Sequence, residues 1–293
     1  MERMNSITQE VAETYVSSRL EIIRNAGDDP FGSFDTIAEE LNYLAILFRQ
    51  QYEKSCEGII GLIEKVHQQL QQSSTTSSTL WELVWLILVA AAVVRGRPSV
   101  SSAGEQSDIL DGELIARVFA IVQWFEREGM ANAPFEMLRP FELATLTFFQ
   151  EFRKVYIVDQ TSSSNRVYRV LRDRIQLGEQ SAVLDFFLRK ITTNCQKYGQ
   201  SQIIIKDTLK LFHDLAEGRY TSRRTMLTLP AVQQLIQDHT NSSLTFLLVP
   251  RNGRERTQYY FVLTMLLVEH NLEMLPTFAQ PFEAIFNQIA ASS

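Results

Sequence analysis

Cysteine, proline and glycine are all scarce in this 293-residue chain, and each shortage excludes a class of protein. The two cysteines, Cys56 and Cys195, lie far apart, so they cannot build a disulfide framework or a zinc ligand set. Their low number is typical of a protein from a reducing compartment. The 8 prolines and 12 glycines fall mainly between periodic apolar segments, so regular structure is expected to run with few interruptions.

An excess of positive charge is also absent, since the formal net charge is −6. This balance argues against binding to nucleic acid or to an anionic membrane over a large surface. Two local basic clusters, Gly218–Arg224 and Arg251–Arg256, are interpreted as solvated turns, with phosphate binding as the alternative. The sequence shows no targeting segment, so cytosol or nucleus is the expected location.

Long hydrophobic runs are rare, and one stands out: LVWLILVAAAVV, Leu83–Val94, holds twelve consecutive residues without a charge. A membrane-spanning helix needs about 20 apolar residues, whereas runs of roughly 10–14 mark buried core helices more often. We therefore interpret Trp81–Val94 as a soluble core helix covered by protein on most sides, with a membrane span as the alternative. No membrane insertion is expected.

Helical periodicity dominates the rest of the chain. One stripe with i, i+3, i+4 and i+7 spacing consists of Leu114, Ile115, Val118, Ile121, Val122 and Phe125. Similar stripes occur within residues 41–66, 143–156, 183–191, 209–215, 232–236, 259–268 and 282–289. The β-branched run Ile203–Ile205 is too short to outweigh its helical surroundings. The pattern predicts roughly ten or eleven helices with short connections, arranged as an all-α solenoid of antiparallel HEAT- or armadillo-like pairs.

Residues 1–293 are expected to form a single solenoid segment. The Ser/Thr/Gln-rich residues 68–79 predict a surface loop that separates two possible sub-blocks, 1–72 and 79–293. A second polar stretch, Thr161–Asn165, is interpreted as a shorter loop.

The histidines, His67, His213, His239 and His270, are the first candidates for chemistry. His213 and Asp214 form an HD dipeptide, which belongs to a class of metal-dependent phosphohydrolases on helical scaffolds. That site needs further His and Asp ligands from neighbouring helices, so a surface or capping histidine is the simpler interpretation. GDDPF, Gly27–Phe31, resembles the paired aspartates of prenyl-diphosphate enzymes, but no third carboxylate follows at the spacing of one helical turn and Pro30 favours a turn.

Other catalytic patterns are missing from the sequence. No Ser-His-Asp or Cys-His arrangement and no glycine-rich phosphate loop can be proposed. The aromatic segment Phe148–Tyr156 could stack on bases, but its helical spacing favours core packing. Asn241–Ser243 fits a glycosylation acceptor, although nothing else indicates secretion. We therefore predict a protein that is not an enzyme, with no catalytic, cofactor-binding or metal-binding residues and no cofactor.

Several longer strings carry a family resemblance. YEKSC (Tyr52–Cys56), ILDGELIARV (Ile109–Val118), LTFFQEFRKVYIVDQ (Leu146–Gln160) and LTLPAVQQLIQDHTNSSLTFL (Leu227–Leu247) occur in this order, with RVYRVL and FFLRKITTN between the last two. From about residue 40 to the C-terminus, the chain resembles the exportin-7 and Ran-binding protein 16 and 17 family of the importin-β superfamily. Residues 1–40 contribute little to this resemblance.

The resemblance implies a nuclear export receptor built as an α-solenoid. Its expected partners are Ran in the GTP form, protein cargo and nucleoporins, and its expected location is the cytoplasm, the nucleus and the nuclear pore. Family members are several-fold longer, and the N-terminal repeats that provide their main contact with Ran have no counterpart in this chain. The chain is therefore expected to be an internal or truncated segment that binds Ran weakly by itself.

Two alternatives remain open. The first is a non-catalytic helical scaffold or tether in membrane traffic or at the nuclear pore, similar in architecture alone. The second is an all-α enzyme, which would require His213 and Asp214 to lie beside two more buried carboxylates or histidines.

Overall fold

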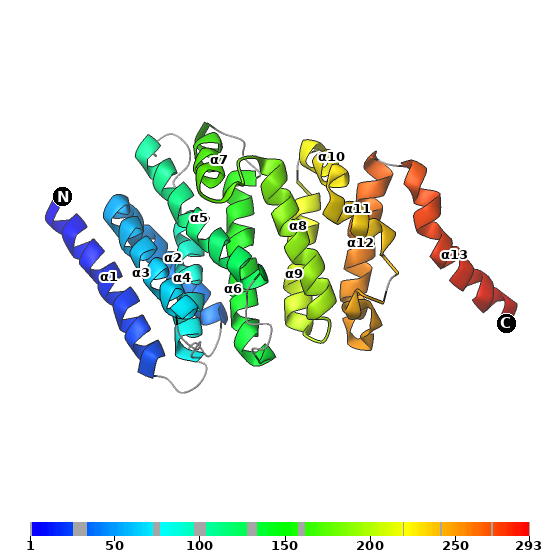
Figure 1. The fold of residues 1–293 in the computed structure, drawn as a ribbon, viewed down its shortest axis with the longest axis horizontal. Helices are drawn as coiled ribbons and strands as arrows, with labels where there is room; N and C mark the ends of the chain where they lie inside the picture. The colour runs from blue at the N-terminus through cyan, green and yellow to red at the C-terminus, as the bar shows by residue number, and fades with distance from the viewer. Residues whose placement is uncertain are drawn as a thin grey trace. The chain divides into compact units, whose positions relative to one another are not determined.

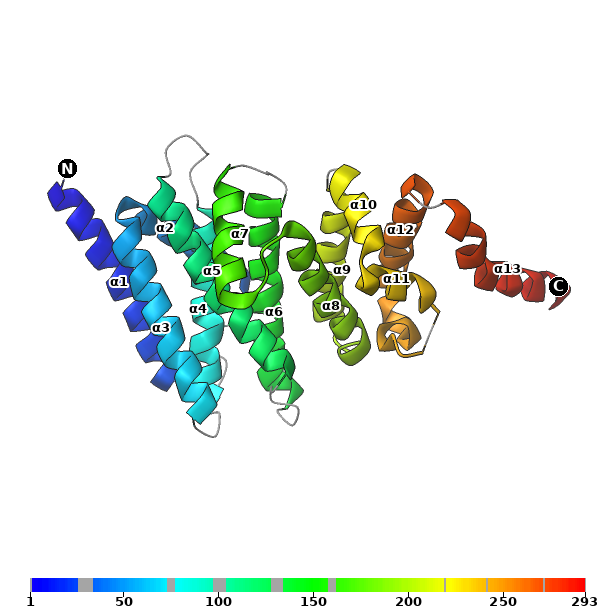
Figure 2. The same cartoon turned by 45° about the horizontal axis from the view of Figure 1, so that its top comes forward.

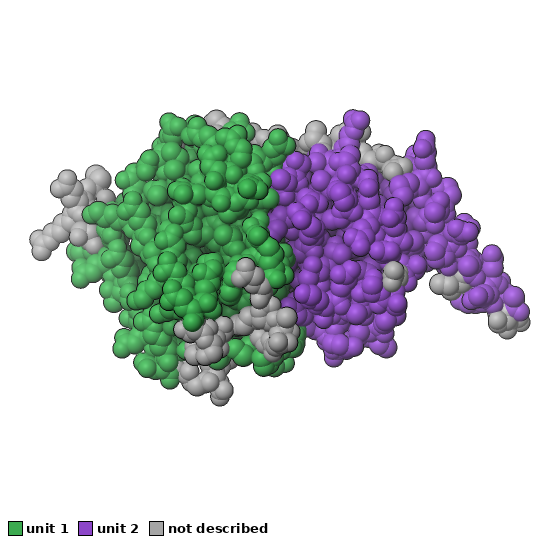
Figure 3. Space-filling model, viewed as in Figure 1, with its two compact units in different colours: residues 1–179 green, residues 180–293 purple. Residues whose placement is uncertain are grey.

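The structure of the chain is a computed structural model that describes residues 2–25, 34–72, 77–96, 104–127, 134–157, 162–218, 220–240, 242–270 and 272–292. Thirteen α-helices and no β-strand occur in these ranges, which confirms the predicted all-α class. The chain divides into two compact units, Met1–Glu179 and Gln180–Ser293 (Figure 3). Each unit is described by itself.

Seven α-helices make up the first unit (Figure 1). They are α1 (Glu2–Asn25), α2 (Phe34–Gln50), α3 (Tyr52–Gln72), α4 (Ser77–Arg95), α5 (Glu105–Arg127), α6 (Phe135–Phe152) and α7 (Ser162–Ile175). A short π-helical stretch, η1 (Arg153–Ile157), continues directly from α6. Directly after α7 comes Gln176, a non-glycine residue with a positive φ of 62°.

Within this unit, alternate helices along the chain pack on each other in two rows. Helices α2, α4 and α6 form one row, and helices α3, α5 and α7 form the other (Figures 1 and 2). Contacts between α2 and α3, α3 and α4, and α4 and α5 join the rows. This stacking of helix pairs is the arrangement of an α-solenoid and agrees with the predicted fold class.

Helix α4 is the most enclosed element of the first unit. It contacts α1, α2, α3, α5 and α6, and every residue from Leu83 to Val94 is buried. A helix that is apolar on all sides is stable in water only when neighbours cover all of those sides, and five helices do so here. The predicted core helix Trp81–Val94 is therefore confirmed, although the helix begins one turn earlier, at Ser77.

Helix α4 also passes a test for membrane spans based on length and composition. It is the one helix in the described ranges that does so, with a mean hydropathy of 1.9 over its 18-residue window. Because 78% of that window is buried inside the protein, the helix has the exposure of a core element.

The second unit contains six α-helices. They are α8 (Gln180–Lys197), α9 (Gln202–Ala216), α10 (Tyr220–Thr228), α11 (Pro230–Gln237), α12 (Gly253–His270) and α13 (Leu275–Ser292). Short 3₁₀ turns, η2 (Thr245–Leu248), η3 (Pro250–Asn252) and η4 (Leu272–Met274), precede α12 and α13. Helix α9 packs against α8, α10 and α12, whereas α13 contacts α12 and η4 at the end of the unit (Figure 1).

Some local predictions were wrong. Thr161–Asn165 was expected to be a loop, but α7 begins at Ser162, because serines are favourable in the first turn of a helix. The two basic clusters were expected to be turns, yet α10 begins at Tyr220 and α12 at Gly253. Arginine is a good helix former, so its charge is a poor indicator of a turn.

The helix count also differs from the roughly ten or eleven expected. Helix α1 lies in the N-terminal region, where the sequence showed no clear stripe, and α10 and α11 are short helices of 9 and 8 residues. The run Ile203–Ile205 is helical as predicted, within α9. Helices α3 and α4, on either side of residues 68–79, contact each other, and a division into sub-blocks at that loop stays a prediction.

Candidate functional site

The HD dipeptide lies in the last turn of α9. His213 Nδ1 is 3.8 Å from Asp214 Oδ1, and His213 Nε2 is 3.7 Å from Glu217 Oε1. The ring of His213 stacks on Phe261 of α12 with centroids 5.8 Å apart. Glu217 was missed in the sequence, where its i+4 spacing from His213 was the available signal.

These three side chains have donor atoms within 4.8 Å of one another, close enough to surround a cation. All three come from consecutive turns of one helix, and none is buried. The enzyme alternative required two more buried carboxylates or histidines beside them. Among the described residues, the structure places only one further carboxylate or histidine in a group with this dipeptide. That residue is Glu217, which is exposed.

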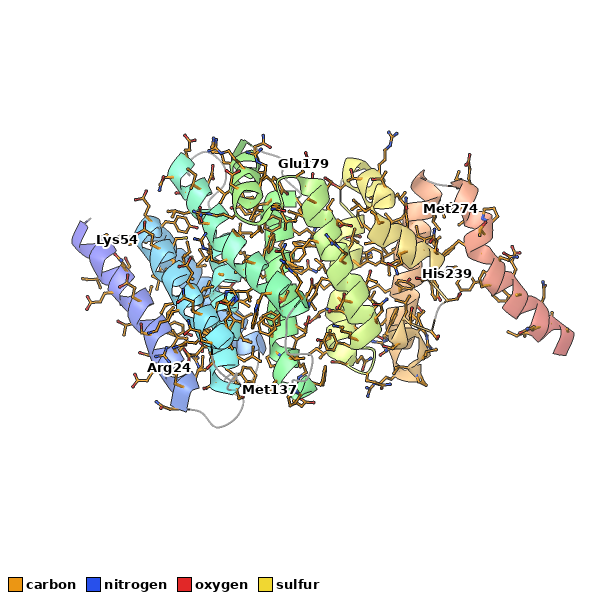
Figure 4. All side chains as sticks on the ribbon, viewed as in Figure 1. Arg24, Lys54, Met137, Glu179, His239 and Met274 are labelled. Atoms are coloured by element: carbon orange, nitrogen blue, oxygen red, sulfur yellow. The ribbon has the colours of Figure 1, made fainter. Side chains whose placement is uncertain are left out.

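The other histidines lie in unrelated surroundings. His67 of α3 packs edge-on against Trp124 of α5, and partial burial lowers its pKa. His239 is buried between α12 and α13 (Figure 4), with Nδ1 2.7 Å from the carbonyl oxygen of Ile236. Its ring lies 4.4 Å from that of Phe278, so it serves as part of an aromatic core.

Some sequence candidates lie outside the described residues. They are the GDDPF segment, Gly27–Phe31, the glycosylation candidate Asn241 and the side chain of His270. Both cysteines are buried and neither forms a disulfide, and burial raises the pKa of the Cys195 thiol to about 12. A thiol with such a pKa is a poor nucleophile at neutral pH.

Two arginines of the second basic cluster, Arg251–Arg256, donate hydrogen bonds to backbone carbonyl oxygens. Arg256 Nη1 donates hydrogen bonds to the carbonyl oxygens of Leu247 (3.2 Å) and Val249 (3.1 Å), and Arg251 donates to the carbonyl oxygen of Gln200. Both guanidinium groups therefore fasten the η2–η3 segment to its neighbours. This use leaves little support for the alternative of a phosphate site.

The aromatic segment Phe148–Tyr156 is core, as its helical spacing predicted. Phe148, Phe149 and Phe152 are fully buried and surround the ring of Phe119 at centroid distances of 5.2–5.9 Å. None of these rings is available to stack on a base.

A buried polar cluster on α5 was missed by the sequence interpretation. The fully buried carboxylate of Asp111 accepts hydrogen bonds from Tyr52 of α3 and, at 2.6 Å, from Tyr156 of η1. One turn earlier, the buried carboxylate of Asp108 accepts a hydrogen bond from Arg166 Nε of α7 at 2.8 Å. The cluster therefore joins α3, α5, η1 and α7.

Most residues of this cluster lie within the strings that carry the family resemblance. Tyr52, Asp111, Tyr156 and Arg166 each belong to one of the strings that carry it: YEKSC, ILDGELIARV, LTFFQEFRKVYIVDQ and RVYRVL. The available signal was the pair of aspartates three residues apart beside the apolar stripe of α5. Because the carboxylates are enclosed, the cluster can hold helices in position but cannot reach a substrate.

Comparison with known proteins identifies the family. A family model described as "Exportin-7-like, TPR domain" matches residues 18–255. The chain belongs to the exportin-7-like family. The predicted resemblance is therefore confirmed, and the match extends into α1, where the sequence strings were uninformative.

Individual members of the exportin-7-like family align over nearly the whole chain. Exportin-7-B of Xenopus laevis is 34% identical over 307 residues, which cover 98% of this chain and 28% of the relative. Ran-binding protein 17 of Homo sapiens is 30% identical over 282 residues, covering 90% of this chain and 25% of its own length. The chain thus spans about a quarter of the length of these relatives. No solved structure matches the chain.

Proposed function

We propose that this chain is part of the helical scaffold of a nuclear export receptor, which carries proteins from the nucleus to the cytoplasm through nuclear pores. The observation that carries this proposal is the family match over residues 18–255, together with relatives named exportin-7 and Ran-binding protein 17. The proposed partners are Ran in the GTP form, protein cargo and nucleoporins. Cytoplasm, nucleus and nuclear pore are the corresponding locations.

The proposed mechanism is non-catalytic. Stacked helix pairs present long surfaces with few enclosed cavities, which suits the binding of folded proteins. Small rotations between successive pairs can couple the binding of one partner to that of another. The buried cluster around Asp111 supports this role, because it joins α3, α5, η1 and α7 without forming an accessible reactive site.

An exchange experiment tests the proposal. The segment of Xenopus laevis Exportin-7-B that aligns with this chain would be replaced by the chain itself. We expect the chimera to bind Ran loaded with a non-hydrolysable GTP analogue in preference to Ran·GDP, and to leave nuclei of permeabilised cells when Ran·GTP is supplied.

The control is a chimera that carries an unrelated α-solenoid segment of equal length. It should fold, as judged by circular dichroism, but it should not show nucleotide-selective binding combined with export. If both chimeras behave alike, or if the first folds and still fails in export, the chain does not act as part of an export receptor. A general helical scaffold, similar in architecture alone, would then be the better description.

A further inference from the structure

Helix α1 exposes an apolar stripe on the side facing away from its core contacts. Ala12, Val16, Leu20 and Ile23 are buried against the first unit. On the outer side, Ile7, Val11 and Ile22 are 54%, 52% and 52% exposed. At 100° per residue these three positions fall within about 60° of one another around the helix. A shallow hollow lined by Ser18, Glu21, Ile22 and Asn25 lies at the C-terminal end of the stripe.

The neighbouring helix α2 extends this stripe. Helices α1 and α2 pack together, and Glu40 of α2 accepts hydrogen bonds from Tyr15 and Arg19 of α1. Val11 lies one turn before Tyr15, and Tyr43 lies about one turn after Glu40, so both border the same seam. Tyr43 and Ile46 are 73% and 60% exposed. We call the surface formed by Ile7, Val11, Ile22, Tyr43 and Ile46 the α1–α2 face.

The charges around the α1–α2 face are mostly negative. Among the side chains that the structure describes on these helices, Glu10 and Glu21 of α1 and Glu39 of α2 are exposed. Both described arginines are occupied, because Arg19 pairs with Glu40 and Arg24 pairs with Glu82 of α4 at 2.7 Å. Figure 4 shows Arg24 at the end of α1. The excess of carboxylates would attract a positively charged partner and repel nucleic acid or an anionic membrane.

We propose that the α1–α2 face binds a basic amphipathic helix of a partner protein. Apolar side chains at i, i+3, i+4 and i+7 of the partner would cover the exposed Val11 and Tyr43, and its flanking Lys or Arg side chains would face the three glutamates. The proposal rests on this surface alone and stands whether or not the chain binds Ran. It goes beyond the proposed function, which names no surface of this chain.

A direct binding experiment tests the proposal with the full chain. The probe is a fluorescein-labelled helical peptide of about 20 residues, with leucine on one side and lysine on the other. A matched peptide with glutamate in place of lysine is the first control. We expect fluorescence anisotropy to show saturable binding of the lysine peptide that weakens with salt, and no binding of the glutamate peptide.

Variants locate the site. Val11→Ala with Tyr43→Ala removes apolar contact, and Glu10→Lys with Glu21→Lys reverses the charge; we expect each pair to weaken binding about tenfold or more. Leu248→Ala and Glu217→Lys change equally exposed positions of the second unit and should alter affinity by less than about twofold. Circular dichroism checks that every variant remains folded, which is expected at exposed helical positions.

Several results would overturn the proposal. The first is absence of binding, and the second is equal binding of the glutamate peptide. The third is an equal loss of affinity in the control variants, which would mean that the peptide is attracted to the acidic protein in general. A dimer that forms through the α1–α2 face and dissociates on Tyr43→Ala would assign the face to a second copy of the chain. Hydrogen exchange that shows protection elsewhere than α1 and α2 would place the peptide at another site.

Discussion

Among single residues, those of α4 are the least tolerant of change. Val89 is fully buried among five neighbouring helices, so Val89→Asp would place a carboxylate where no partner can solvate it. We expect the free energy of unfolding to fall by several kcal/mol in urea titrations followed by circular dichroism. The same change at Val11, which is half exposed, should cost less than about 1 kcal/mol. An unchanged midpoint for Val89→Asp would contradict the buried location of α4.

Two helical glycines make a second residue-scale test. A Cβ at Gly112 of α5 would lie 2.8 Å from the Cβ of Val170 on α7, so Gly112→Ala should force the two helices apart. A Cβ at Gly61 of α3 would meet nothing within 4 Å. We expect Gly112→Ala to destabilise by about 1–3 kcal/mol and Gly61→Ala to stabilise by about 0.5–1 kcal/mol in thermal melts. Equal effects would mean that α5 and α7 are less closely packed than the structure shows.

The buried carboxylate of Asp111 gives a third test. Tyr52→Phe removes one of its two tyrosine donors, and a buried carboxylate oxygen that loses a hydrogen bond is costly. We expect a loss of about 1.5–3 kcal/mol in the free energy of unfolding. Tyr43→Phe, at an exposed position of α2, should leave stability unchanged and controls for the loss of a hydroxyl. A similar result for both variants would show that the cluster does not hold α3 to α5.

Among whole helices, the two at the ends of their units differ in how they are fastened. Helix α1 contacts α2 and α4 and is held by the Arg24–Glu82 ion pair and by Tyr15 against Trp85, whose rings are 5.9 Å apart. Helix α13 is held through Phe278 and Phe282, which pack around His239. Beyond these residues α13 extends away from α12 in both views (Figures 1 and 2).

The C-terminal half of α13 exposes large apolar side chains. Phe286 and Ile289 are 71% and 59% exposed on a helix that has a single charged residue, Glu283. Exposed apolar side chains of this size promote association, so we expect the chain to self-associate as its concentration rises. Sedimentation equilibrium should show that Phe286→Lys together with Ile289→Lys reduces the association. The control variant Gln280→Lys, at another exposed position of α13, should not reduce it. A monomer at all concentrations would count against this prediction.

At the scale of the whole molecule, the fraction of the relatives that this chain covers sets the expected affinity for Ran. Under the proposed function, a receptor that holds Ran at several separate patches would leave only some of them in a chain that spans about a quarter of its relatives. Loss of about 4 kcal/mol of contact weakens binding roughly a thousandfold, and separated patches also lose the gain in effective concentration.

Titration of Ran·GTP against the purified chain measures this effect. We expect weak or undetectable binding, with no hydrolysis or exchange of nucleotide caused by the chain. Full-length Ran-binding protein 17 of Homo sapiens under the same conditions is the positive control. Nanomolar, nucleotide-selective binding by the chain alone would show that its own repeats carry the main Ran contact.

The sequence by itself determined the features that depend on local pattern. The i, i+3, i+4 and i+7 spacing predicted the helical class, the all-apolar run predicted the enclosed helix α4, and the aromatic spacing predicted the buried rings of Phe148–Tyr156. These predictions succeed because periodicity records directly which side of a helix is covered. The sequence strings from YEKSC to LTLPAVQQLIQDHTNSSLTFL predicted the family of this chain, and the family match confirmed it.

Only the tertiary structure decided which residues far apart in the chain meet. Asp111 receives donors 59 and 45 residues away, from Tyr52 and Tyr156, and no local pattern encodes such a pairing. Glu40 and Glu82 lie in similar helical contexts, yet each occupies an arginine of α1 because of how α1 packs against α2 and α4. That packing also leaves Val11 and Tyr43 uncovered, since exposure depends on neighbours that a helix acquires only when the chain folds.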